Sequence, residues 1–74
     1  MNVQEIEDAL GPTPFVPFEV HLDNGKVVLV PHHDSLLFNE RKTAVVVASG
    51  GRLHIMAVDH ITSLSFPEPR KAEA

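Results

Sequence analysis

Five histidines are the residues of this 74-residue chain best suited to chemistry, because an imidazole can act as acid, base or metal ligand near neutral pH. No cysteine and no His-Glu-x-x-His pattern accompanies them. His21 and His54 fall on the polar parity of their predicted strands, so they approach only if those strands are neighbours. We therefore expect no metal or cofactor, and keep a histidine-based metal site as an alternative. The five are His21, His32, His33, His54 and His60.

The residue types of a hydrolytic triad occur side by side at His33, Asp34 and Ser35. Adjacent side chains in an extended or bent segment diverge, so they cannot form a hydrogen-bonded relay. The chain also has no nucleophile elbow and no phosphate-binding glycine loop. We predict a non-catalytic protein without catalytic residues.

A second carboxylate–imidazole pair, Asp59-His60, lies at a predicted corner between two strands. A carboxylate in that position can orient the ring or close the turn through an Asx-type bond. Structural capping of the corner and a contact with a partner are the two interpretations of this pair.

The charge balance disfavours RNA as a partner without excluding it. Six Lys and Arg face ten Asp and Glu, for a net charge of −4, and no Tyr or Trp is present to stack on bases. Basic residues gathered at hairpin tips would still form a modest basic rim. The candidate residues for contact with RNA or a protein partner are Arg41, Lys42, Arg52, Asp59 and His60.

The first element that positions these residues is a helix at 2–10. Asn2 can cap it, Glu5 can complete a capping box, and Gly11-Pro12 ends it. Apolar residues recur on one face at helical spacing, namely Val3, Ile6 and Leu10.

Short strands joined by tight turns follow. Asp23-Asn24-Gly25-Lys26 is the strongest hairpin signal, Ser49-Gly50-Gly51 marks another hairpin, and Pro31 begins a bend. Five strands are predicted, at 18–22, 27–30, 43–48, 52–58 and 61–66, and the short segment 35–38 is a further candidate strand. In strand 52–58, the apolar parity of Leu53, Ile55 and Ala57 alternates with the polar parity of Arg52, His54 and Met56.

Two apolar segments have alternative interpretations. The run 43–48 is apolar on both faces, which predicts a strand covered on both sides, either by a helix over a barrel wall or by a second subunit. The segment 14–18, with phenylalanines framed by prolines, is either a docking segment or a lock over the chain's own core, and we favour the core.

These elements predict a mainly β fold with one N-terminal helix: a small, strongly bent five-stranded antiparallel meander or partly open barrel. Residues 1–66 form the single domain, and 67–74 a disordered tail. A chain this short has a small core, and it has no cysteine for a disulfide, so we expect self-association to support it.

Four segments resemble a family of short bacterial proteins of uncharacterised function. They are Pro14-Phe15-Val16-Pro17-Phe18, Leu22-Asp23-Asn24-Gly25-Lys26, Val30-Pro31-His32 and Asp59-His60-Ile61-Thr62-Ser63-Leu64. The resemblance covers nearly the whole chain and implies a bacterial cytoplasmic protein, with no activity attached.

A looser similarity is to the bacterial Sm-like RNA chaperone family, whose members have a helix followed by five bent strands and form RNA-binding rings. This similarity implies that the barrel is Sm-like or SH3-like. By position, His60 corresponds to that family's RNA-contacting histidine. Asp59 stands where the family has a lysine, so a repelling charge replaces an attracting one, and the segment between Gly25 and His60 is longer than in the family.

Together these patterns predict a cytoplasmic, non-catalytic protein-interaction domain whose partner is a second copy of itself or another protein. No segment is apolar for long enough to span a membrane. The alternatives are a Sm-like RNA-binding protein and a histidine-based metal-binding protein.

Overall fold

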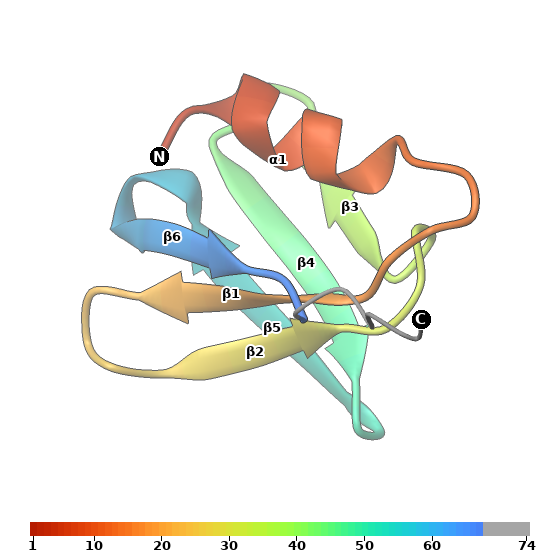
Figure 1. The fold of residues 1–74 in the computed structure, drawn as a ribbon. Helices are drawn as coiled ribbons and strands as arrows, with labels where there is room; N and C mark the ends of the chain where they lie inside the picture. Colours follow the sequence, from red (N-terminus) through yellow and green to blue (C-terminus); the bar gives the residue numbers. More distant parts are fainter. Residues whose placement is uncertain (68–74) are drawn as a thin grey trace.

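The computed structural model describes residues 1–67 as one N-terminal helix followed by six short strands (Figure 1). The mainly β class with an N-terminal helix is therefore confirmed. The elements are α1 (Val3–Leu10), β1 (Phe18–Leu22), β2 (Val27–Val30), β3 (Leu36–Phe38), β4 (Ala44–Ser49), β5 (Arg52–Ala57), the 3₁₀ turn η1 (Val58–His60) and β6 (Ile61–Ser65).

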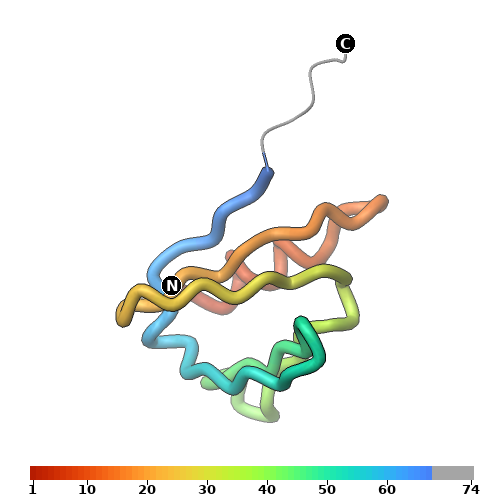
Figure 2. The backbone as a smooth tube through the Cα atoms, turned by 90° about the horizontal axis from the view of Figure 1, so that it is seen from below, coloured from red at the N-terminus to blue at the C-terminus, as the bar shows by residue number. Residues whose placement is uncertain are grey.

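The strands form two three-stranded antiparallel sheets, so the predicted single five-stranded meander is wrong. The first sheet has the order β2-β1-β6 and the second the order β3-β4-β5, and Figure 2 shows them as separate layers. Pro31 causes the division, because it has no N–H to continue a ladder and β2 ends directly before it. The chain then turns, with the Ser35 N–H donating to the His32 carbonyl at 3.0 Å, before β3 starts the second sheet.

Helix α1 begins as predicted. The Asn2 side chain accepts from the Glu5 N–H at 2.9 Å, and the Glu5 carboxylate accepts from the Asn2 N–H, which completes the capping box. The helix buries Ile6 and Ala9 against the sheets. Glu7 forms an ion pair with Lys42, which connects α1 to the turn between β3 and β4.

Both predicted hairpins are confirmed. In the β1–β2 turn the Asn24 side chain accepts from the Lys26 N–H at 2.9 Å, and Gly25 has φ +88°. In the β4–β5 turn Gly50 and Gly51 have φ +61° and +75°, the left-handed values that a tight two-residue hairpin requires.

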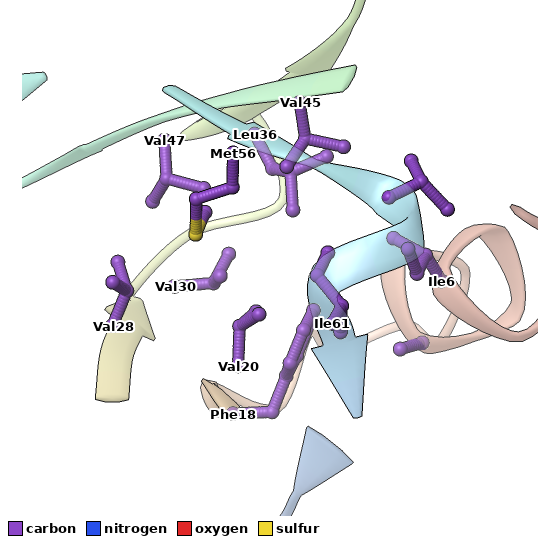
Figure 3. Packing of buried hydrophobic residues seen from close by; sticks show 12 residues of the cluster. Ile6, Phe18, Val20, Val28, Val30, Leu36, Val45, Val47, Met56 and Ile61 are labelled. Atoms are coloured by element: carbon purple, nitrogen blue, oxygen red, sulfur yellow. The ribbon is translucent and has the colours of Figure 1, made fainter. Parts of the chain in front are cut away.

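The core lies between the two sheets and under α1, where side chains from all three point toward one another (Figure 3). Phe18 is 1% exposed, and the ring of Phe15 packs against it with centroids 5.9 Å apart. The core interpretation of segment 14–18 is thus confirmed for its phenylalanines. The buried residues are Ile6, Ala9, Phe18, Val20, Val28, Val30, Leu36, Val45, Val47, Met56, Val58 and Ile61.

The side-chain parity predicted for β5 is wrong. Met56 is buried, whereas Leu53 and Ile55 are 73% and 76% exposed. The register sets this outcome: Met56 lies opposite the buried Val45, so it shares that residue's inward side. Because β5 has apolar residues on both parities, its pattern alone did not identify the inward set.

The sequence also predicts a disordered C-terminal tail and no membrane-spanning segment. From residue 68 onward, the predicted disordered tail (67–74) lies outside the described residues. Within residues 1–67, no helix combines the length and apolar character needed to cross a membrane.

Candidate interaction surface

His60 does not bond to its neighbour Asp59 but to Asp23 in the β1–β2 turn. The His60 Nδ1 lies 2.8 Å from the Asp23 Oδ2, and the Asp23 N–H donates to the His60 carbonyl at 2.9 Å. The hydrogen bond and the negative charge of Asp23 raise the pKa of His60 above its usual value. This arrangement fastens η1 to the hairpin turn and leaves both side chains exposed.

Sequence reasoning missed Asp23 as the partner of His60. The two residues are 37 positions apart, and only the return of β6 to pair with β1 brings η1 beside the turn. No local pattern signals that long-range pairing.

The predicted basic residues lie at opposite ends of β4. Arg41 and Lys42 belong to the turn that precedes β4, where the Lys42 ammonium pairs with Glu7 and lies 5.8 Å from the centre of the Phe38 ring. Arg52 begins β5 opposite Ser49, at the far end of β4. The structure therefore does not bring these three cations together.

The histidines are likewise dispersed. His21 projects from the first sheet, with its Nε2 2.7 Å from the Ser65 Oγ. His54 belongs to the second sheet, so these two strands are not neighbours. Among the described residues, no group of three or more histidine or acidic side chains is placed to hold a metal ion.

The outward side of the second sheet is apolar across all three strands. Leu37, Val46 and Ile55 form one row, because Leu37 pairs with Val46 and Val46 pairs with Ile55. Alternate residues along each strand share a face. We name as the apolar face the residues Leu37, Ala44, Val46, Ala48, Leu53, Ile55 and Ala57, among which Leu37, Leu53 and Ile55 are 66–76% exposed.

The outer edge of β5 has free backbone groups beside this face. The Ala48 N–H donates to the Ser35 carbonyl at 2.9 Å and the Ala44 carbonyl accepts from the Asn39 N–H at 3.1 Å, so the even residues of β4 bond away from β5. Their partners on β5 are therefore non-hydrogen-bonded partners, whose own N–H and C=O groups point outward. These partners are Leu53, Ile55 and Ala57.

A groove of about 490 Å³ keeps this edge accessible. One wall is β5, and the other is the β1–β2 hairpin with Asp23 and Lys26; His60 lies in the same groove. The free edge of β5 thus faces open space within the described part of the chain.

The other strand edges have features that discourage pairing. β3 is only three residues long, β2 is flanked by Lys26 and Pro31, and the pairing of β6 with β1 has an irregular register. Short length, lysine, proline and bulges are the features with which proteins protect sheet edges. β5 is six residues long and has none of these features between Leu53 and Ala57.

Comparisons with known protein families, with curated proteins and with solved structures give no match.

Proposed function

We propose that this chain is a non-catalytic, cytoplasmic protein-interaction domain that self-associates through the second sheet. The single observation that supports this is the apolar face. On this continuous surface the large side chains of Leu37 in β3 and of Leu53 and Ile55 in β5 are 66–76% exposed. A contiguous exposed apolar patch on a small protein typically marks a site of association.

The predicted double coverage of strand 43–48 supports the same proposal. Val45 and Val47 are fully buried against the core, while Val46 on the opposite side is only half-buried and Ala48 is exposed. A second molecule on the outward side would complete the coverage that the β-branched run predicts.

Covering the apolar face completely would supply free energy comparable with the cost of association. Burying a Leu or Ile side chain completely contributes about 1.5–3 kcal/mol. Leu37, Leu53 and Ile55 are already about one-quarter to one-third buried, so the three contribute about 1–2 kcal/mol each in each of two copies. That sum is comparable with the association cost of about 4–15 kcal/mol, and paired backbone groups add to it.

We further propose that the two sheets are the halves of a partly open Sm-like or SH3-like barrel. Three features support this: β6 returns to pair with β1, the Pro31 bend leads from β2 in one sheet to β3 in the other, and η1 joins β5 to β6. A barrel of this kind has two exposed strand edges at its seam, and β5 provides one of them.

RNA binding has less support. The imidazole of His60 is paired with a carboxylate, Lys42 is paired with Glu7, and Arg52 lies at the other end of β4 from Lys42. If labelled single-stranded RNA nevertheless binds at low ionic strength, with an affinity that falls steeply as salt rises, the Sm-like function would replace the one proposed here.

The test is sedimentation velocity over a range of concentrations on the wild-type protein and on two lysine variants. Ile55→Lys places a charge in the apolar face, and Val27→Lys places the same charge on the first sheet, at a residue that is 47% exposed. We expect the wild type and Val27→Lys to associate alike and Ile55→Lys to remain monomeric. Circular dichroism should show that both variants stay folded, because both positions are exposed.

A wild-type protein that remains monomeric at high micromolar concentration would refute self-association. Equal weakening by Ile55→Lys and Val27→Lys would instead show that the apolar face is not the contact surface.

A further inference from the structure

We propose that two copies of this chain join edge to edge, with β5 of one copy antiparallel to β5 of the other about a two-fold axis at Ile55. This inference rests on the proposed self-association and names its geometry. The resulting contact would unite two three-stranded sheets into one six-stranded sheet.

The free backbone groups of β5 supply the first argument. Leu53, Ile55 and Ala57 present their N–H and C=O groups outward, and an open groove of about 490 Å³ borders them. In an antiparallel pair, directly opposed residues of this kind exchange two N–H···O bonds. With the axis at Ile55, Ile55 opposes Ile55 of the second copy and Leu53 opposes Ala57, so all three residues on each edge find partners.

The side chains of the strand complement themselves in the same register. Each large Leu53 lies beside a small Ala57 of the second copy, so the outward surface stays level across the junction. If the axis moved by one residue along β5, only two of Leu53, Ile55 and Ala57 would oppose each other. The third would have no strand residue of the second copy to receive its N–H and C=O groups. The register centred on Ile55 is therefore the one that satisfies the most backbone groups.

The charges at the two ends of β5 are complementary as well. Arg52 precedes the paired segment and Asp59 follows it, and neither forms an ion pair within residues 1–67. In the centred register the paired segment of each copy ends at Ala57, so Arg52 of one copy lies at the end where η1 of the other begins and carries Asp59. The two-fold axis repeats this contact at the other end, so the contact brings together two opposite-charge pairs.

The geometry limits the assemblies that can form. A two-fold contact closes on itself and gives a dimer, and the joined apolar faces allow two dimers to stack into a tetramer. A contact between β5 of one copy and a different strand of the next would instead produce a ring or a filament.

The test uses single-cysteine variants, since the natural chain contains no cysteine. Ile55→Cys places two thiols across the proposed axis, where the Cα atoms of opposed residues are about 5.5 Å apart, a distance that suits a disulfide. In sheets stacked face to face the separation is about 10 Å, too far for the bond. Leu37→Cys is the matched control, because Leu37 lies on the same apolar face but belongs to β3, which β4 separates from β5.

With oxidised glutathione as the oxidant, we expect Ile55→Cys to form a covalent dimer at least about tenfold faster than Leu37→Cys. Equal rates for the two variants, or faster linkage of Leu37→Cys, in a protein that still associates would overturn edge pairing while leaving self-association intact. A wild-type protein that is monomeric in sedimentation would overturn the proposed function itself.

Amide exchange of the unmodified protein gives a second readout. The N–H groups of Leu53, Ile55 and Ala57 should exchange quickly in dilute protein and become protected at high concentration. The N–H of Leu29, on the edge of the first sheet, serves as the control and should not change. Associated protein in which these three amides remain unprotected would also overturn edge pairing.

Discussion

The two sheets of this small protein share one core but present different surfaces. Both turn apolar side chains inward, and each consists of three antiparallel strands. On the outward side the first sheet carries Glu19, His21, Ser63 and Ser65 beside two half-exposed apolar residues of β2, whereas the second sheet carries only apolar residues across its strand pairs from Ala44 to Ala48. A core requires only the inward residues, so the apolar residues on the outward side of the second sheet are the ones that the proposed self-association would cover.

The edges of the sheets repeat this contrast. β2 of the first sheet lies between Lys26 and Pro31, both of which discourage further pairing. β5 of the second sheet has no such residue along its free positions. The same sheet therefore has both the unprotected face and the unprotected edge, which is the arrangement expected if one sheet maintains the fold's solubility and the other recruits a partner.

The largest expected effect concerns the hydrophobic core that the two sheets share. Phe18→Ala in the first sheet should lower the free energy of unfolding by about 3–5 kcal/mol, and Met56→Ala in the second by about 2–5 kcal/mol, because each leaves a cavity in the shared core. Urea denaturation followed by circular dichroism measures both. A loss below about 1 kcal/mol for either would mean that its sheet does not contribute to the common core.

The next effect should separate the two outer faces. Leu53→Lys should weaken self-association about a hundredfold, equivalent to about 2.7 kcal/mol, because each copy loses an apolar contact beside Ala57 of the other and gains a charge that must be desolvated. Leu29→Lys places the same charge on the first sheet, where the residue is 45% exposed, and should change the dissociation constant less than about threefold. Sedimentation equilibrium compares them, and similar effects would remove the distinction between the faces.

Each hairpin turn should respond to the loss of its glycine. Gly50→Ala and Gly25→Ala should each lower the free energy of unfolding by about 1–3 kcal/mol, because both residues have positive φ, and no neighbouring atom adds a clash. Gly11→Ala is the control, since Gly11 has φ −83° and should tolerate alanine. Thermal denaturation of the three variants tests the expectation, which fails if Gly11→Ala is as costly as the other two.

The smallest effect concerns the link between the hairpin of the first sheet and η1. Asp23→Asn should lower the pKa of His60 toward its usual value, which an NMR titration of the imidazole measures. Because folding raises this pKa, its contribution to stability is present below the unfolded value of about 6.5 and is lost as the pH rises through the folded value. The wild type should therefore exceed Asp23→Asn in stability more at pH 6 than at pH 9, and a difference independent of pH would contradict the role of the imidazole charge.

Local features of the fold could be predicted from the sequence because neighbouring residues determine them. The capping box of Asn2 and Glu5, the Asn24-Gly25 turn and the Gly50-Gly51 turn each depend on a few consecutive positions. The bend after Pro31 was also predicted. Which strands share the first sheet depends on β6 returning to β1, and no local pattern encodes that pairing.

The candidate surface could be predicted only in part for the same reason. The run 43–48 predicted a strand covered on both sides, whereas the structure covers only its inward side, at Val45 and Val47. The exposed Leu53 and Ile55 were assigned to the wrong side, because β5 is apolar on both parities and only its pairing with β4 decides which side faces inward. Asp23 was missed as the partner of His60, since the contact spans 37 positions.

Native mass spectrometry of the untagged wild-type protein tests the central claim, self-association through the second sheet, most directly, because it counts subunits in each assembly. Edge pairing about a two-fold axis predicts dimers or tetramers at high micromolar concentration, and these should disappear in the Ile55→Lys variant and persist in Val27→Lys. A wild-type spectrum that contains only monomer under those conditions would contradict the claim.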